Sequence, residues 1–253
     1  KQLNLLDKLP NTSLHTNLPL NTRETFSYFF VSSVKEDTTF ADWMEDVQID
    51  KGVEIISKAG MLLMQNGIKS MTMDDISRQL GISKKTLYQY VNDKNDLVVK
   101  VMGTIVDAEK QAANSLCAAN PNAIDMVFEL TKEMSQKYDR THPSIHYDMQ
   151  KYHPDAWEVF TDFKENFIAD CMKDNIERGI EQGLYRSNID PFIISRVYTA
   201  KVEFCFDGHT FPPSQYDFGK IHLEIMRYHV RGIASDKGLE YLKQKVKQEK
   251  IEL

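Results

Sequence analysis

The chain has 253 residues, with 31 lysines and arginines against 37 aspartates and glutamates, and a formal net charge of −6. Its 42% hydrophobic residues suffice for a core and exclude wholesale disorder. No uncharged apolar run approaches the roughly 18 residues that a membrane span needs, so we expect no membrane partner. The acidic balance excludes a globally basic nucleic-acid coat. Three widely spaced cysteines, Cys117, Cys171 and Cys205, indicate a reduced, cytoplasmic protein without a disulfide framework.

Residues 1–43 differ from the rest of the chain. Asparagine, threonine and proline interrupt any apolar period there, and the segment lacks the continuous apolar region of a signal peptide. Met44 is the first of 11 methionines. Two interpretations stay open: residues 1–43 are upstream sequence translated ahead of a start at Met44, or they form a genuine N-terminal arm. With only four scattered lysines and arginines, the segment is not a basic tract.

From Val47 onward the apolar residues recur at helical spacing, and no strand alternation or repeat interrupts them. Helix-entry signals accompany this periodicity: Thr72 with Asp75 forms a capping-box pattern, and prolines stand near the start of three later helices. The predicted fold class is therefore all-α. The expected helices cover residues 53–66, 73–80, 83–90, 93–119, 122–138, 155–184, 192–206 and 216–231, with a last one from Ser235.

The turn at residues 80–83 joins two short helices and has the features of a helix-turn-helix. Gly81 can adopt the positive φ that ends the first helix, because it has no Cβ. Ser83 is a typical N-cap for the second helix and leaves the other N-terminal N–H groups available to a phosphate. Lys84 and Lys85 follow in the first turn, where side chains reach a major groove.

This segment resembles the tetracycline-repressor (TetR) family of transcriptional regulators. Residues 72–97, TMDDISRQLGISKKTLYQYVNDKNDL, follow that family's pattern T-x-x-x-I-A-x-x-A-G-V-S-x-G-T-L-Y-x-Y-F-x-x-K-x-x-L, and the resemblance is strong over residues 53–97. It implies a three-helix DNA-binding domain at residues 47–95 and a helical effector-binding and dimerisation domain at residues 96–253.

The implied function is sequence-specific DNA binding by a homodimeric transcriptional regulator. We expect a repressor that a small apolar or amphipathic effector releases from a palindromic double-stranded DNA operator. No cofactor, metal or catalytic residue is expected, and the protein is expected not to be an enzyme.

Nine residues are predicted to contact DNA: Thr72, Ser83, Lys84, Lys85, Thr86, Tyr88, Gln89, Tyr90 and Lys94. The resemblance implies that Thr72 and Lys94 hold phosphates and that the threonine and tyrosines at 86, 88 and 90 face the DNA backbone. We expect Lys84, Lys85 and Gln89 at base edges, since glutamine can pair bidentately with adenine.

The chain departs from the family pattern at three positions: Lys85 replaces a small residue, Val91 an aromatic one and Leu80 an alanine. Residues 50–97 carry seven lysines and arginines against six acidic residues, so their net charge is only +1. The position of the lysines at helix starts, rather than the total, indicates a local DNA face.

Aromatic residues of the C-terminal part are candidates for an effector pocket, with ordinary core packing as the alternative. The candidates are Phe128, Tyr147, Trp157, Phe160, Tyr198 and Phe204. By their order in the chain, helices 192–206 and 216–231 correspond to the family's dimerisation pair, again with intramolecular core as the alternative. Their expected apolar seam comprises Val197, Ala200, Val202, Ile221, Ile225 and Met226.

Four other interpretations receive less support. His142 and His146 have the spacing of a metal site, but Pro143 is expected to start a helix between them and to separate their faces. A nucleophilic cysteine is disfavoured because no base or oxyanion motif accompanies it. Two further classes stay open: a helix-turn-helix module that binds a protein without operator binding, and an enzyme in the C-terminal cavity.

Overall fold

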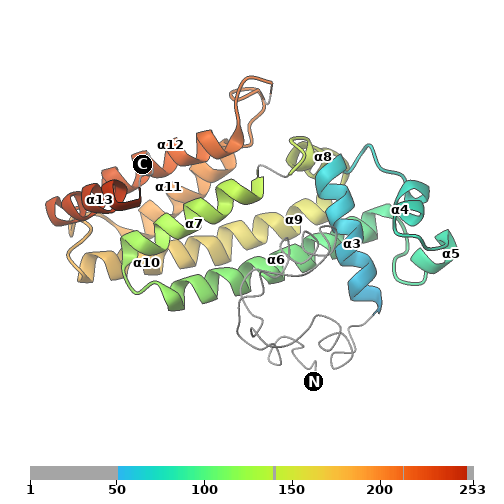
Figure 1. Ribbon diagram of the computed structural model, residues 1–253, viewed down its shortest axis with the longest axis horizontal. Coiled ribbons are helices and arrows are strands. Elements are labelled where there is room, and N and C mark those ends of the chain that lie inside the picture. The colour runs from blue at the N-terminus through green and yellow to red at the C-terminus, as the bar shows by residue number, and fades with distance from the viewer. Residues whose placement is uncertain (1–50, 139–140, 213, 250–253) are drawn as a thin grey trace. The chain divides into compact units, whose positions relative to one another are not determined.

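The computed structural model of the protein describes residues 51–138, 141–212 and 214–249 (Figure 1). These residues form helices and no β-ladder beyond an isolated antiparallel bridge between Tyr185 and Ala234, which confirms the all-α fold class. The predicted extension at residues 1–43 lies outside the described residues. The elements are α3 (Lys51–Asn66), α4 (Met73–Gln79), α5 (Lys84–Leu87), α6 (Lys94–Ala119), α7 (Ala123–Tyr138), α8 (Ile145–Tyr152), α9 (Pro154–Asp162), η2 (Phe163–Ile168), α10 (Ala169–Glu181), α11 (Pro191–Phe204), α12 (Phe218–Ile233) and α13 (Asp236–Glu249).

The chain divides into two compact units within α6, with Ala112 ending the first unit and Ala113 beginning the second. The helix itself is continuous through this point. The predicted domains, residues 47–95 and 96–253, were defined by expected function, and their boundary stays a prediction. None of the described helices combines the length and apolar character needed to cross a bilayer.

In the first unit, α3 buries one face because apolar residues recur at every fourth position. Ile55, Ala59 and Leu63 lie on that face, with Ala59 and Leu63 fully buried. The short helices α4 and α5 each contribute a fully buried anchor, Ile76 and Leu87. These buried residues anchor the short helices of the helix-turn-helix in the core of the unit.

In the second unit, α10 packs on α11 and α7 packs on α12 (Figure 1). A buried polar network ties α7 to α10. The Tyr185 hydroxyl donates to Asn175 Oδ1 (3.1 Å), and Asn175 Nδ2 donates to the Ala123 carbonyl (2.9 Å). The side chain of Gln182 accepts from the Ala123 N–H (3.0 Å), so α10 satisfies an otherwise unpaired donor at the N-terminus of α7.

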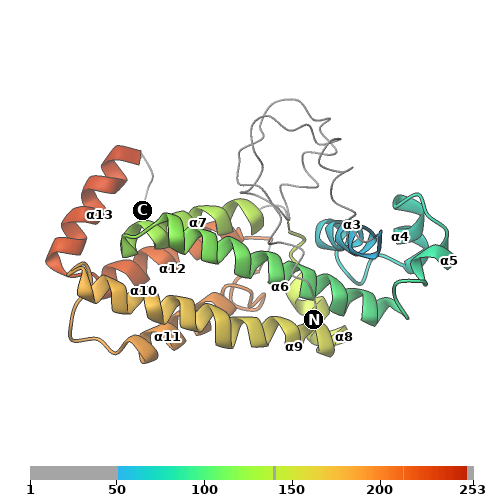
Figure 2. The ribbon, with the colours of Figure 1, turned by 90° about the horizontal axis from the view of Figure 1, so that it is seen from below.

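Helices α9 and α10 follow one another along a single axis with the π-helical segment η2 between them, as Figure 2 shows. The helix predicted at residues 155–184 is therefore a continuous run of helix from Pro154 to Glu181 with a π-helical middle. Within η2, Lys164 is buried and forms an ion pair with Glu203 of α11. The guanidinium of Arg196, also on α11, donates to the Glu165 carbonyl.

Candidate nucleic-acid interface and aromatic cluster

Helix α4 begins with a complete capping box. The Thr72 hydroxyl oxygen accepts from the Asp75 N–H (3.2 Å), and an Asp75 carboxylate oxygen accepts from the Thr72 N–H (3.1 Å). The Thr72 hydroxyl also donates to that carboxylate (2.5 Å), and these hydrogen bonds lower the pKa of Asp75. The predicted phosphate contact at Thr72 thus starts from a hydroxyl that already has a partner.

The turn between the two short helices is held by backbone hydrogen bonds. Gly81 adopts a φ of 68°, and its N–H donates to the Arg78 carbonyl (3.2 Å). The next N–H, from Ile82, donates to the Ser77 carbonyl (3.1 Å). Because L-residues rarely adopt this φ, glycine fits the end of α4 as predicted.

Helix α5 is a single turn that Ser83 caps as predicted, with its hydroxyl oxygen accepting from the Thr86 N–H (3.0 Å). The predicted helix extends to Tyr90, but the α-helix ends at Leu87. Beyond it, the Gln89 N–H donates to the Thr86 carbonyl (3.2 Å) and the Tyr90 N–H to the Leu87 carbonyl (3.0 Å), which tightens the last turn to three-residue spacing.

The outer surface of this turn carries long polar side chains. Lys85, Tyr88 and Gln89 are exposed, whereas Leu87 is fully buried and anchors the turn to the core. Lys84 is exposed too, but its ammonium pairs with the Asp74 carboxylate at 3.0 Å. Among the other predicted DNA contacts, Ser83 and Thr72 are exposed and Thr86, Tyr90 and Lys94 are half-buried.

The start of α6 contains a contact that the sequence analysis missed. Lys100 Nζ donates to the Tyr90 carbonyl (2.7 Å) and pairs with the Asp96 carboxylate (3.0 Å). The Asp96 carboxylate also accepts from the Asn92 N–H (2.7 Å). The four-residue spacing of Asp96 and Lys100 was the available signal. Together these bonds hold the segment after α5 against α6.

In the second unit, six rings from α8, α9, α12 and the residues after α11 form a continuous group, which we call the aromatic–histidine cluster. Its members are His146, Trp157, Phe160, Phe206, Phe218 and His222. The ring of His146 stacks on Phe206 (centroids 3.4 Å apart) and meets Phe160 edge-on (5.2 Å). Phe206 stacks on Phe218 (4.5 Å), and Phe218 stacks on His222 (5.7 Å).

Both histidines of the cluster are held neutral. Burial lowers the pKa of His146 to about 3 and that of His222 to about 4. His222 is completely buried, and neither of its ring nitrogens has a hydrogen-bond partner within the described structure. The cluster therefore presents apolar faces together with an uncharged polar edge.

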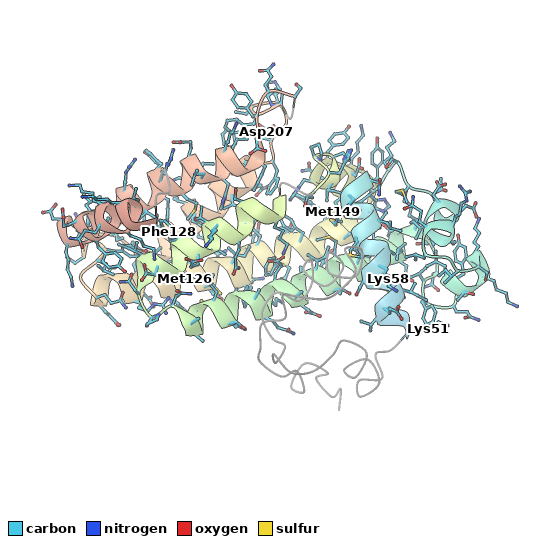
Figure 3. All side chains as sticks on the ribbon, viewed as in Figure 1. Lys51, Lys58, Met126, Phe128, Met149 and Asp207 are labelled. Carbon is cyan, nitrogen blue, oxygen red and sulfur yellow. The ribbon has the colours of Figure 1, made fainter. Side chains whose placement is uncertain are left out.

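The six effector candidates do not come together in one place. Trp157 and Phe160 are neighbours within the aromatic–histidine cluster (centroids 5.4 Å apart). Phe128 is buried on α7, whereas Tyr147 is 54% exposed on α8, and Figure 3 shows these parts of the unit well apart at Phe128 and Met149. Tyr198 is a core residue, and Phe204 is 48% exposed.

A small apolar pocket next to Phe128 lies among α7, α12 and α13, and its rim includes Arg227 and Arg231. It is separate from the aromatic–histidine cluster, which combines the predicted Trp157 and Phe160 with four rings that were not predicted: His146, Phe206, Phe218 and His222. Helical periodicity alone could not have identified them, because they come from separate segments.

The expected apolar seam needs a correction. Val202, Ile221 and Met226 are buried within the unit, so they cannot form a surface seam in this conformation. Val197 and Ala200 are exposed as a seam requires. Three large apolar residues of α11 outside the expected seam are also exposed: Phe192 and Ile193 (57% each) and Phe204 (48%).

The metal and nucleophile interpretations gain no geometric support. His142 lies before α8 begins, and His146 lies in its first turn against aromatic rings. No group of three histidine, cysteine, aspartate or glutamate side chains among the described residues can hold a metal ion. Burial raises the pKa of Cys171 to about 11 and that of Cys205 to about 12, which disfavours the reactive thiolate.

Comparison with known proteins places this geometry among bacterial regulators. Residues 55–101 match the family model described as bacterial regulatory proteins, tetR family. The HTH-type transcriptional regulator YvaF of Bacillus subtilis is 25% identical over 183 residues, which are 72% of this chain and 95% of that protein.

Solved structures share the fold at low sequence identity. The reduced form of NemR from E. coli is 13% identical, with a TM-score of 0.61, over 74% of this chain and 98% of its own. FadR from Bacillus subtilis, solved in complex with stearoyl-CoA, is also 13% identical, with a TM-score of 0.54, over 72% of this chain and 100% of its own.

Proposed function

We propose that this chain, whose residues 55–101 match the model for bacterial regulatory proteins of the tetR family, is a homodimeric transcriptional repressor controlled by a small-molecule effector. Because its proposed partner is chromosomal DNA, we place the protein in the cytoplasm. The finer points, namely the contact residues, the dimer face and the effector site, are our proposals.

The proposed DNA interface rests on one observation, the row of exposed side chains on the turn formed by α5 and the residues after it. Lys85 and Gln89 are four residues apart and exposed, while Leu87 between them is fully buried. Lys85 brings a positive charge suited to phosphate or guanine, and Gln89 can form two hydrogen bonds with adenine. Tyr88, 43% exposed, adds a ring and a hydroxyl for the DNA backbone.

We place the effector at the aromatic–histidine cluster. Stacked rings provide apolar surface, and the neutral, unpartnered imidazole of His222 offers one donor and one acceptor. This chemistry favours an uncharged, flat molecule with a polar group at one edge. The stearoyl-CoA in the complex of FadR is a different kind of molecule, which fits a fold whose ligands vary with the lining side chains.

Release from DNA would follow from differential binding. Two copies of α5 must be spaced to enter successive major grooves, about 34 Å apart along the duplex. An effector that binds better to a conformation with another spacing lowers the operator affinity without touching DNA. The effector and the operator would therefore weaken each other's binding by the same factor.

The test is fluorescence anisotropy with the gene's own upstream DNA at two salt concentrations and with competitor DNA. The wild type is expected to bind tightly and salt-sensitively. Lys85→Ala should weaken binding to every sequence. Gln89→Ala should instead alter the base preference at one operator position, where the free-energy difference between the preferred base and the others should change by about 1–3 kcal/mol. Equal loss on all sequences for both variants would contradict the assignment of Gln89.

Weak, non-specific binding by the wild type to all upstream fragments would instead favour the protein-interaction module. Repeating the titration with a chain that begins at Met44 measures what residues 1–43 contribute. An unchanged affinity would show that the segment is dispensable for DNA binding.

A further inference from the structure

The two lysines that begin α5 have different surroundings, although the sequence pattern treats them alike. Lys84 Nζ lies 3.0 Å from each carboxylate oxygen of Asp74, which belongs to the first turn of α4. Lys85 has no ion-pair partner within the described structure. The ion pair therefore crosses the helix-turn-helix and joins its two helices at the surface that carries the proposed DNA contacts.

The acidic partner is not otherwise engaged. The neighbouring carboxylate, Asp75, is committed to the capping box with Thr72, but Asp74 makes no helix cap and its described contact is with Lys84. The hydrogen bond from Lys84 to Asp74, together with the carboxylate charge, raises the pKa of Lys84.

We propose that Asp74 is a positioning residue that masks Lys84 from DNA, so that α5 offers Lys85 as its one unmasked lysine. The inference rests on the proposed DNA-binding function and deepens it. A carboxylate oxygen 3.0 Å from the ammonium occupies a position that a phosphate oxygen would take and offsets the positive charge of the lysine there. While the ion pair is intact, Lys84 therefore neutralises little phosphate charge and displaces few counterions from DNA. Its ammonium instead joins α5 to α4.

Removing the carboxylate gives a measurable consequence. In Asp74→Asn the freed Lys84 can contact a phosphate, and each added phosphate contact steepens the slope of log K against log salt by about 0.9. A dimer with two helix-turn-helix units should gain a slope of roughly 2. Affinity at low salt should rise for all DNA sequences in similar proportion, because phosphate contacts carry no sequence information.

The experiment measures salt slopes by anisotropy for five full-length proteins: the wild type, Asp74→Asn, Asp74→Asn with Lys84→Gln, Asp74→Glu, and Asp107→Asn. The double variant should return to the wild-type slope, since the gain comes through Lys84. Asp74→Glu keeps the carboxylate and should restore the wild-type slope. Thermal unfolding of each protein separates loss of fold from loss of binding.

Asp107→Asn is the matched control. It makes the same charge change on the exposed surface of α6 in the same unit. It lies about 20 Å along the helix from Lys94, which exceeds the Debye length of about 8 Å at physiological salt. Its slope should equal that of the wild type.

The outcomes separate the two proposals. A wild type that binds DNA, together with an Asp74→Asn variant of unchanged slope, would overturn the masking role alone. A steep slope that persists in the double variant would also overturn it, because the gain would not pass through Lys84. A wild type that binds no DNA would overturn the proposed function and this inference with it.

Discussion

His222 shows how a single buried side chain makes the stability of this protein depend on pH. Its ring is completely buried, and burial lowers its pKa from 6.5 to about 4. Above pH 6.5 the ring is neutral in both the folded and the unfolded chain. Between pH 6.5 and about 4 the unfolded chain takes up a proton that the folded chain rejects, so the free energy of unfolding falls as the pH falls.

We therefore expect His222→Leu to flatten this dependence. Between pH 7 and pH 5 the wild type should lose on the order of 2 kcal/mol more of its free energy of unfolding than the variant, by linkage. Chemical denaturation at the two pH values measures the difference. At pH 7 the variant should be no less stable, because it removes two unpartnered buried polar atoms.

His209→Gln is the matched control, because it also removes one histidine, but at an exposed position. His229 and His146 also have depressed pKa values, of about 4 and about 3, so part of the acid sensitivity persists in His222→Leu. An identical loss of stability in the wild type and His222→Leu would contradict the buried neutral state.

At the scale of the helix, the π-helical segment η2 is explained by its contacts with α11. Lys164 is 6% exposed and pairs with Glu203, which is 48% exposed. Breaking a buried ion pair costs more when the buried partner remains, because its charge is then left without compensation. Glu165 is a weak substitute, with its carboxylate 4.0 Å from the Lys164 ammonium.

Glu203→Leu should therefore lower the free energy of unfolding by roughly 1–3 kcal/mol, and Lys164→Leu by less, since the remaining Glu203 is hydrated. The double variant should be close to Lys164→Leu alone. Urea denaturation of the three variants gives the comparison. If Lys164→Leu were the more destabilising, the ion pair would not be the feature that holds η2 to α11.

Elements whose signals are local were predictable from the sequence. The capping box at Thr72, the positive φ at Gly81 and the N-cap at Ser83 each depend on residues within four positions, and all three are present. The pairing of Asp74 with Lys84 was not predictable, because it depends on how α4 packs against α5. The π-helical form of η2 was not predictable either, because it depends on contacts with α11, whereas its sequence has the apolar spacing of an ordinary α-helix.

Helical periodicity also did not decide which partner buries a given face. Val202 and Val197 lie on the same helix, α11, and both are apolar, yet Val202 is buried and Val197 is 39% exposed. The distinction depends on which helices surround α11, and the sequence does not contain that information locally. The six effector candidates lie apart for the same reason: a pocket gathers residues from several helices, whereas composition identifies only the type of side chain.

For the whole molecule, the unburied face of α11 sets the expectation for assembly. Ile193, Val197, Ala200 and Phe204 follow one another at three- and four-residue spacing and are all exposed. A contiguous apolar row of this kind on a protein surface marks an interaction site. Because dimeric helix-turn-helix regulators bind the two half-sites of a near-palindromic operator, we expect a second copy of this chain to cover the row.

Val197→Glu should therefore shift the protein from dimer to monomer in sedimentation equilibrium and weaken operator binding, while the thermal midpoint of a diluted, monomeric sample stays unchanged. Tyr147→Glu makes the same charge change at an exposed aromatic residue that is not part of this row, on α8, and should leave the dimer intact. If Val197→Glu remained dimeric with full operator affinity, another face of the molecule would have to join the two copies. Loss of the dimer with retained affinity would instead mean that one helix-turn-helix unit suffices for binding, which would contradict the two-site reading of a palindromic operator.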